Sequence, residues 1–167
     1  NSLKAAKEKI ACLTAYDSTF TNLISKEGIE IILVGDSLGN VIQGHKTTLP
    51  VTVEQMAYHT SCVSKVEPRS LIISDLPFMS YATSGKAFKT ASIMLQKGAE
   101  MVKVEGGEWL TPIISNLIER GIPVCAHLGL TPQSIHMLGG YKAQGKSSEA
   151  ADSILADAIK IEEAGAS

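Results

Sequence analysis

The sequence lacks the features that mark a membrane-spanning, nucleic-acid-binding or disulfide-rich protein. It has no run of about 18 consecutive apolar residues, so no membrane span is expected. Aromatic residues make up only 5% and the formal net charge is −2, which argues against base stacking and against nucleic acid or an anionic membrane as a partner. The cysteines, Cys12, Cys62 and Cys125, are far apart in the sequence. This spacing indicates a reducing compartment rather than a zinc site or disulfides, and we predict that Cys12 and Cys125 are small buried side chains.

Common nucleotide-binding and nucleophile motifs are also missing. No Gly-x-Gly-x-x-Gly, phosphate-binding loop or nucleophile elbow occurs. What the chain has is 167 residues, 44% hydrophobic and 19% charged, which is the composition of one globular domain with a real core.

Three segments share one local pattern, and they are "KEGIEIILVGD" (26–36), "QKGAEMVKVEG" (96–106) and "ERGIPVCAHLG" (119–129). Each has a charged helix end, a glycine, a short apolar run and then a polar residue. Gly28, Gly98 and Gly121 suit the left-handed position that ends a helix. The apolar runs do not alternate with polar residues, which is typical of parallel strands covered on both faces.

Helical and apolar segments alternate five times, which predicts an α/β fold with a parallel sheet. The predicted strands are roughly 10–16, 31–36, 71–75, 101–105 and 123–127. The predicted helices are 19–26, 53–64 (opened by a Thr52–Gln55 capping box), 85–97, 108–120 and 149–164. The final "IEEAGAS" repeats the pattern that precedes a strand. A doubly wound sheet could stop at five strands, whereas a (β/α)8 barrel needs eight and about 250 residues.

Polar residues stand where the predicted strands end. They are Asp36 with Ser37, Asp75, Lys103 with Glu105, and His127; Asp17 follows the first strand in the same way. Taken singly, each has a structural explanation: Asp36 as a turn residue, Asp75 as an acceptor for the next loop, Lys103 as a surface residue and His127 as a structural histidine. Together, three carboxylates converging from neighbouring strands would repel one another. A divalent cation, most simply Mg²⁺, would relieve that repulsion.

Lys103 and Glu105 are two residues apart on one predicted strand, so both point to one face. Val102 and Val104 then face the helices. A lysine on the inner face needs an anionic partner, which we expect to be a substrate carboxylate or an enolate oxygen. Two long loops, 35–52 and 128–148, leave the same end of the sheet and are candidate lids or binding segments. The pair Gly106-Gly107 would permit close approach of a ligand.

The residues at these positions resemble a known family. The segments "TAYD" (14–17), "LVGDSLG" (33–39), "QGHKTTLPVT" (43–52), "DLPFMSYAT" (75–83), "VKVEGGEW" (102–109), "HLGLTPQS" (127–134) and "GGYKAQGK" (139–146) resemble ketopantoate hydroxymethyltransferase, in order and in register along essentially the whole chain. The resemblance implies a (β/α)8 TIM barrel, and residues 1–167 would then be a single barrel domain, C-terminally incomplete, covering about the first five βα units. It also implies a cytoplasmic homo-oligomer, commonly a decamer.

The resemblance further implies transfer of a one-carbon unit from 5,10-methylenetetrahydrofolate to 3-methyl-2-oxobutanoate, through an enolate that Mg²⁺ stabilises. The metal ligands would be Asp36, Asp75 and, through water, Glu105. Ser37 and Lys103 would contact the oxo acid, and His127 would line the same pocket. The family's catalytic base is a Glu at the end of strand six, which lies beyond Ser167, so no catalytic base is assigned within this sequence.

Two other functions stay open at this point. The chain could belong to another Mg²⁺-dependent barrel acting on oxo acids, of the phosphoenolpyruvate mutase and isocitrate lyase group, although no match to the cysteine-bearing catalytic loop of that group is seen. It could also be a non-catalytic fragment that binds metal or partner chains but lacks the base.

Overall fold

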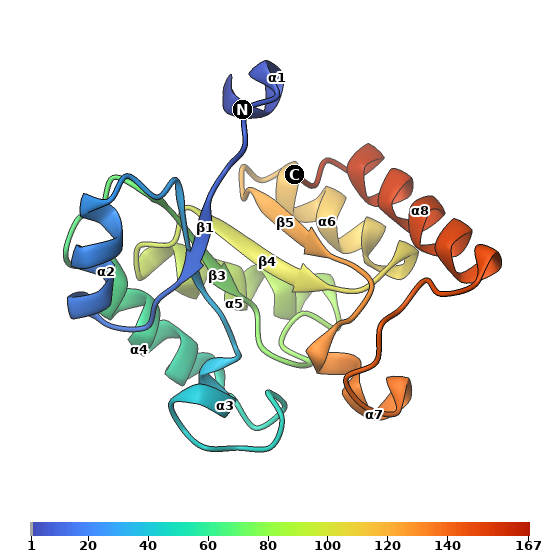
Figure 1. The fold of residues 1–167 in the computed structure, drawn as a ribbon, viewed down its shortest axis with the longest axis horizontal. Coiled ribbons are helices and arrows are strands. Elements are labelled where there is room, and N and C mark those ends of the chain that lie inside the picture. The colour runs from blue at the N-terminus through green and yellow to red at the C-terminus, as the bar shows by residue number, and fades with distance from the viewer. Residues whose placement is uncertain (1) are drawn as a thin grey trace.

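A computed structural model describes residues 2–167 and shows a five-stranded parallel sheet whose strands follow chain order (Figure 1). The strands are β1 (Cys12–Thr14), β2 (Ile31–Val34), β3 (Leu71–Asp75), β4 (Met101–Glu105) and β5 (Val124–His127). Each strand pairs in parallel with the next. A doubly wound sheet reverses its strand order at a switch point, whereas a barrel keeps strands in sequence. The α/β prediction is confirmed, and the order is that of a barrel wall.

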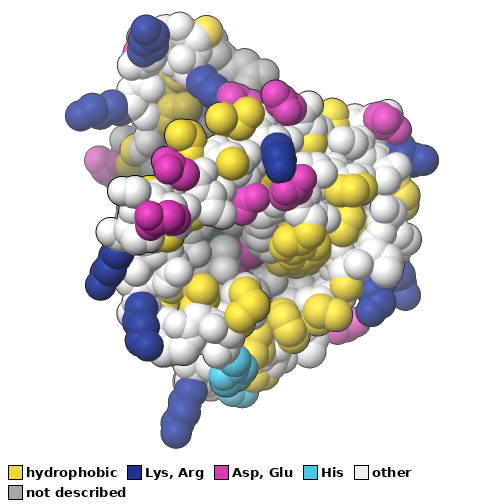
Figure 2. All heavy atoms as spheres, turned by 90° about the vertical axis from the view of Figure 1, so that its right-hand side faces the viewer, with side chains coloured by type: hydrophobic (Ala, Val, Ile, Leu, Met, Phe, Trp, Pro, Cys, Tyr) yellow, Lys and Arg dark blue, Asp and Glu magenta, His cyan; other side chains and the backbone are white. Residues whose placement is uncertain are grey.

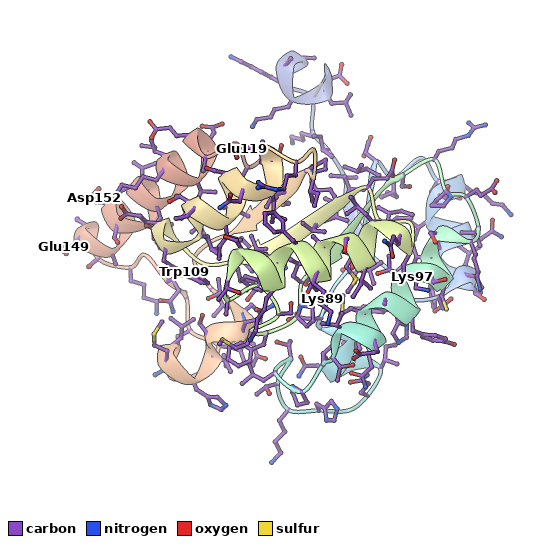
Figure 3. The ribbon with its side chains drawn as sticks, turned by 180° about the vertical axis from the view of Figure 1, so that it is seen from behind. Lys89, Lys97, Trp109, Glu119, Glu149 and Asp152 are labelled. Atoms are coloured by element: carbon purple, nitrogen blue, oxygen red, sulfur yellow. The ribbon has the colours of Figure 1, made fainter. Side chains whose placement is uncertain are left out.

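The longer helices follow the strands and cover one face of the sheet. They are α2 (Ser18–Lys26), α4 (Val53–Ser64), α5 (Ser84–Gln96), α6 (Thr111–Ile118) and α8 (Ser148–Glu163). Seen from behind, α4, α5, α6 and α8 lie over the back of the sheet, and charged side chains such as Lys89, Glu119 and Asp152 project away from it (Figure 3). The predicted capping box of α4 is present: Thr52 accepts from the Gln55 N–H and Gln55 accepts from the Thr52 N–H.

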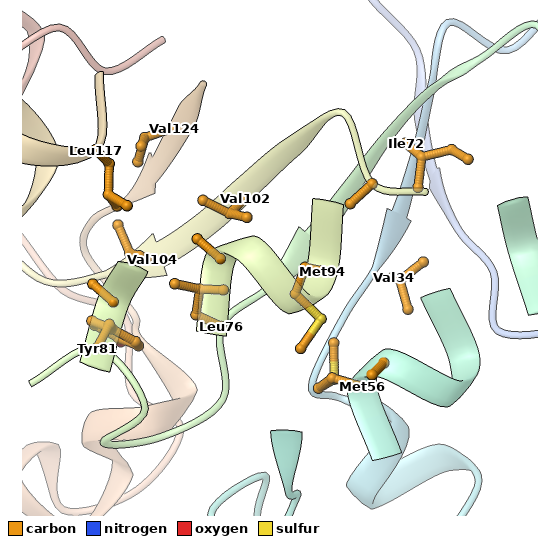
Figure 4. Packing of buried hydrophobic residues seen from close by; sticks show 14 of the residues in the cluster. Val34, Met56, Ile72, Leu76, Tyr81, Met94, Val102, Val104, Leu117 and Val124 are labelled. Atoms are coloured by element: carbon orange, nitrogen blue, oxygen red, sulfur yellow. The ribbon is translucent and has the colours of Figure 1, made fainter. Parts of the chain in front are cut away.

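The core lies between this face of the sheet and the helices (Figure 4). Val34, Val102 and Val104 of the strands are fully buried, as are Met94 of α5 and Leu117 of α6. Val102 and Val104 therefore face the helices, as predicted from their alternation with Lys103 and Glu105. That alternation turns Lys103 and Glu105 to the opposite face, which no helix layer within residues 2–167 covers (Figure 1).

Several short elements were not predicted. They are α1 (Ser2–Ala6), α3 (Leu38–Val41), the 3₁₀ turn η2 (Pro132–Ser134) and α7 (Ile135–Leu138). The predicted helix 108–120 begins with a 3₁₀ turn, η1 (Glu108–Leu110), and continues as α6. Three of the short elements organise the two long loops: α3 lies in 35–52, while η2 and α7 lie in 128–148. Both loops sit at the carboxyl ends of the strands (Figure 1). The predicted left-handed glycines are confirmed, with φ of 76° at Gly28, 99° at Gly98 and 77° at Gly121.

The prediction that Cys12 and Cys125 are buried is wrong for Cys12, which is exposed, while Cys125 is only half-buried. Cys12 belongs to the edge strand β1, whose residues are all exposed. Cys125 of β5 pairs in register with Lys103 of the neighbouring strand β4, on the sheet face that the described helices leave open. An apolar run predicts a strand but does not tell whether both of its faces are covered. No helix within residues 2–167 has the length and hydropathy that crossing a bilayer requires.

Candidate functional site

Three neighbouring strands each bring one buried carboxylate to the same end of the sheet. Asp36 follows β2, Asp75 ends β3 and Glu105 ends β4, and their exposed fractions are 2%, 3% and 4%. The parallel register pairs Asp75 with Lys103 and Glu105 with His127. The sequence-predicted residues thus lie together because consecutive parallel strands end side by side.

Lys103 links two of the three carboxylates. Its Nζ lies 2.7 Å from Asp75 Oδ1 and 3.4 Å from Glu105 Oε1, and its side chain is only 13% exposed. The other oxygen of Asp75, Oδ2, accepts a 3.0 Å hydrogen bond from the backbone N–H of Asp36. The anionic partner that a buried lysine requires is therefore supplied by the protein itself, at Asp75 and Glu105.

His127 and Ser37 stand at the margins of this cluster. His127 Nδ1 lies 3.0 Å from Glu105 Oε1, and its side chain is 35% exposed. Ser37 Oγ lies 2.7 Å from the Tyr16 hydroxyl. A Cβ added at Gly35 would lie 2.9 Å from Ser37 Oγ and 3.5 Å from Asp75 Oδ2, so Ser37 and Asp75 both flank this glycine. Asp17 serves elsewhere: it caps α2 by accepting a hydrogen bond from the Phe20 N–H.

Sequence reasoning missed Gln133, which the loop after β5 inserts into the cluster. Its Nε2 donates to Asp36 Oδ2 at 2.8 Å and to the Leu76 carbonyl at 2.9 Å. Its backbone N–H donates to Glu105 Oε2 at 3.0 Å. Gln133 is neutral and lies in no predicted element, and its place within "HLGLTPQS" was the only available signal.

Burial and mutual repulsion make the charges in the cluster unequal. Burial, together with the charges of Asp75 and Glu105, raises the pKa of Asp36 to about 7. Burial also raises the pKa of Asp75, although Lys103 opposes that rise. Burial acts on Glu105 as well, but its hydrogen bond with His127 and the Lys103 charge outweigh burial and lower its pKa. Asp36 is therefore the carboxylate whose negative charge the protein leaves uncompensated.

The cluster fits a hard cation held by few protein ligands. Within residues 2–167, no set of three or more His, Cys, Asp and Glu side chains is gathered closely enough to ligate one ion. Both oxygens of Glu105 are already hydrogen-bonded, to His127 and Lys103 and to the Gln133 N–H. Both oxygens of Asp75 are engaged as well, Oδ1 by Lys103 Nζ and Oδ2 by the Asp36 N–H, whereas no hydrogen bond in the described chain uses Asp36 Oδ1. Mg²⁺ is typically held by one or two carboxylates plus waters, and Asp36 with its neighbour Asp75 offers such carboxylates.

An aromatic slot adjoins the cluster and is defined by a cavity of about 170 Å³ lined by Phe78, Met79, Tyr81, Ala82, Glu105, Trp109, Gln133 and Ser134. The rings of Tyr81 and Trp109 are nearly parallel, at an angle of 10°, with centroids 6.4 Å apart. A Cβ at Gly106 would lie 2.6 Å from the Trp109 ring, and one at Gly107 would collide with Asp157. The absence of a Cβ at these two glycines makes room for Trp109 and Asp157, and both glycines also line a neighbouring cavity.

Comparison with known proteins places this site in context. The family model for ketopantoate hydroxymethyltransferase matches residues 1–167. The 3-methyl-2-oxobutanoate hydroxymethyltransferases of Cupriavidus necator and Ralstonia nicotianae are 57% and 55% identical over 164 residues, which is 98% of this chain. The chain spans 60% of the length of these curated relatives.

Solved structures share the fold at much lower identity. A phosphoenolpyruvate phosphomutase from Streptomyces platensis subsp. rosaceus superposes with a TM-score of 0.73 at 12% identity, over 99% of this chain and 60% of its own. A phosphonopyruvate hydrolase in complex with oxalate and Mg²⁺ gives 0.72 at 12% identity, over 97% and 57%. A 2,3-dimethylmalate lyase of the PEP mutase/isocitrate lyase superfamily gives 0.69 at 15% identity, over 99% and 57%. These likenesses show the fold alone.

Proposed function

The chain belongs to the ketopantoate hydroxymethyltransferase family, and we propose that its protein transfers a hydroxymethyl group from 5,10-methylenetetrahydrofolate to 3-methyl-2-oxobutanoate, giving ketopantoate. The observation that carries this proposal is the buried cluster of Asp36, Asp75 and Glu105 around Lys103, at the strand ends where barrel enzymes place their chemistry. Relatives above 50% identity support the substrate pair.

Within this cluster, Asp36 and Asp75 would hold Mg²⁺ directly, and Glu105 would hold it through water. The metal would polarise the 2-oxo group and so acidify the neighbouring C–H bond. Asp36 is suited to the role because burial and the charges of Asp75 and Glu105 outweigh the compensation that Lys103 and Gln133 give its carboxylate. Asp75 is fixed for it by the Asp36 N–H on one oxygen and by Lys103 on the other.

Lys103, Ser37 and His127 would orient the oxo acid. The carboxylates around Lys103 outweigh its burial and raise its pKa, so the ammonium stays charged and can stabilise negative charge that develops on the substrate oxygen. Ser37 Oγ would donate to the substrate from the Asp36 side, and His127 from the more exposed edge. Glu105 and Asp75 are engaged by Lys103, and we assign no base for the C3 proton among residues 2–167.

The aromatic slot is our candidate for the ring system of the one-carbon donor. Transfer requires the two substrates to touch, and the slot shares Glu105 and Gln133 with the cluster. Flat aromatic walls such as Tyr81 and Trp109 favour a flat heterocycle. Trp109 is the single tryptophan of residues 1–167, so quenching of fluorescence by tetrahydrofolate that is lost in Trp109→Phe reports on this slot. Unchanged emission would place the donor elsewhere.

A direct assay tests the activity itself. The protein as encoded by its gene is supplied with 3-methyl-2-oxobutanoate and 5,10-methylenetetrahydrofolate, with Mg²⁺ or with a chelator, and ketopantoate is measured by mass spectrometry. We expect product only with all three components. Turnover without the folate, or none in the complete mixture, would contradict the proposal and favour a different oxo-acid reaction on the shared fold, as in the phosphoenolpyruvate mutase and isocitrate lyase group.

We also propose that residues 1–167 belong to one (β/α)8 barrel domain, in a cytoplasmic homo-oligomer, commonly a decamer. Exposed apolar side chains at both edges of the sheet, such as Leu13 and Leu155, support further cover beyond these residues. Light scattering of the protein as encoded measures the assembly, and a monomer would contradict this part of the proposal.

A further inference from the structure

We propose that Gln133 is a positioning residue that fixes which oxygen of Asp36 faces the metal position and that couples Asp36 to Glu105. Resting on the proposed function, this inference adds a residue from an irregular loop to a site otherwise built at strand ends. Gln133 is 6% exposed and hydrogen-bonds to both carboxylates, through its side chain to Asp36 and through its backbone to Glu105.

The partners of the Gln133 amide allow only one orientation. Its two Nε2 protons go to Asp36 Oδ2 at 2.8 Å and to the Leu76 carbonyl, which can only accept, at 2.9 Å. Its Oε1 lies 2.6 Å from the Tyr81 hydroxyl, which donates to it. If the amide were turned over, its carbonyl oxygen would face those two acceptors, and its NH₂ group would face Tyr81. The amide therefore presents a donor, and never an acceptor, to Asp36.

Tyr81 closes this arrangement into a ring of hydrogen bonds. The Glu105 N–H donates to the Tyr81 oxygen at 3.2 Å, Tyr81 donates to Gln133 Oε1, and the Gln133 N–H returns to Glu105 Oε2. Tyr81 is 4% exposed, and burial raises its pKa, so its hydroxyl keeps its proton. The end of β4, the loop after β3 and the loop after β5 are thereby tied together, and a shift in one moves the others.

The ring determines how Asp36 meets a cation. Gln133 holds Asp36 Oδ2 and Asp75 holds the Asp36 N–H, which restricts the side chain and leaves Oδ1 without a hydrogen bond in the described chain. An oriented oxygen binds a metal more tightly than one that must first be ordered, and loss of such supporting contacts typically lowers metal affinity about 10–100-fold. A residue that merely anchored the loop would not affect metal binding in this way.

The test measures Mg²⁺ affinity by calorimetry, without substrates, on the protein as encoded. We expect Gln133→Leu to weaken Mg²⁺ binding about 10–100-fold. Tyr81→Phe deletes one hydroxyl and keeps the ring, so it should fold even if Gln133→Leu does not. It leaves Gln133 Oε1 without its donor, and we expect a smaller but measurable loss of affinity.

Asn116→Leu is the matched control. The Asn116 amide also joins a side chain and a backbone carbonyl, Ser84 Oγ at 3.3 Å and Pro112 O at 2.7 Å, but on the helical side of the molecule. The Asn116→Leu substitution should leave Mg²⁺ affinity unchanged. Wild-type affinity in a folded Gln133→Leu, or in Tyr81→Phe, would overturn the inference and make Gln133 a loop anchor. Because binding is measured without substrates, that outcome leaves the proposed reaction standing, whereas failure of the wild type to bind Mg²⁺ would count against both.

Discussion

The centre of the sheet and its two edges differ in what they bury. At the ends of β2, β3 and β4, three carboxylates are at most 4% exposed. At the edges, apolar side chains are open: Leu13 of β1 is 47% exposed, while Leu155 and Ile159 of α8, beyond β5, are 61% and 50% exposed. Figure 2 faces the α8 side and shows hydrophobic side chains lying among acidic ones. The usual preference for apolar side chains inside and charges outside is thus reversed at both places.

The two reversals have different physical causes. Buried charges persist only where they are paired, hydrogen-bonded or bound to a metal. The buried carboxylates at the centre therefore indicate a binding or catalytic site. Exposed apolar side chains along a sheet edge indicate a surface that another segment or chain covers. A residue at the centre should therefore respond to substitution differently from a residue of the same type away from it.

The largest effect is expected at Asp75. Asp75→Asn removes a charge that faces both Lys103 and the Asp36 N–H, and with it the metal's polarising contribution of several kcal/mol. We expect turnover of the protein as encoded to fall about a thousandfold, and Asp36→Asn to act similarly. Asp152→Asn, at an exposed position on α8 (Figure 3), should change nothing. Steady-state kinetics measures this contrast, and near-normal turnover in either site variant would break the metal assignment.

Lys103→Met should have the next largest effect, on stability. Removing one partner from a buried ion pair typically costs about 3–5 kcal/mol, because the remaining charge stays buried. Asp75 and Glu105 would then face each other without their shared cation. We expect the free energy of unfolding to fall by that amount and added Mg²⁺ to restore part of it. Lys97→Met, at the exposed C-terminal cap of α5, is the control. Equal losses of unfolding free energy in the two variants would contradict a specific stabilising role of Lys103 in the cluster.

The edges are tested by two leucines. Leu117 is a fully buried residue of α6, and Leu117→Ala should lower the free energy of unfolding by about 2–5 kcal/mol. If further chain covers the edge, Leu13→Ala should cost about 2 kcal/mol in the protein as encoded. If β1 stays as open as it is within residues 2–167, the cost should be under about 0.5 kcal/mol. Denaturant unfolding of both variants distinguishes the two cases, and we expect the first.

The contrast between centre and edge also marks how far sequence reasoning reached. The strands β3 and β4 were predicted with their observed limits, because a short segment rich in β-branched and aliphatic residues that ends in a carboxylate specifies a strand and its end. The convergence of Asp36, Asp75 and Glu105 then followed from parallel pairing alone. Cys12 was misjudged because an edge strand has the same local pattern as a central one. Asp17 was grouped with the strand ends, yet a local hydrogen bond to the Phe20 N–H makes it a helix cap.

Gln133 could not be predicted, for a different reason. Its hydrogen-bond partners Asp36, Leu76, Tyr81 and Glu105 come from three other segments of the chain, and nothing in its own neighbourhood requires it to be buried. Residues whose role depends on several distant contacts leave no periodic pattern or charge cluster. The sequence therefore predicts the groups that carry charge in this site better than the groups that orient them.

The smallest effect expected is a pH dependence of the metal-free protein. Burial raises the pKa of Asp36 from 3.8 to about 7, so its contribution to stability is complete below the lower value and is lost as pH rises toward 7. Glu105 has a lowered pKa, so its contribution is lost only as pH falls below its ordinary range. The two act in different pH ranges: between pH 5 and pH 7 the change comes from Asp36, and Glu105 contributes only at lower pH.

Without Mg²⁺, the thermal midpoint of the protein as encoded should therefore decline between pH 5 and pH 7. A bound cation favours the ionised form of Asp36, so Mg²⁺ should raise the midpoint more at pH 8 than at pH 5. In Asp36→Asn this group no longer titrates, and the decline should flatten, whereas Asp152→Asn should keep it. An equal Mg²⁺ effect at both pH values would mean that Asp36 is not the uncompensated charge at the centre, and the contrast with the edges would then rest on burial alone.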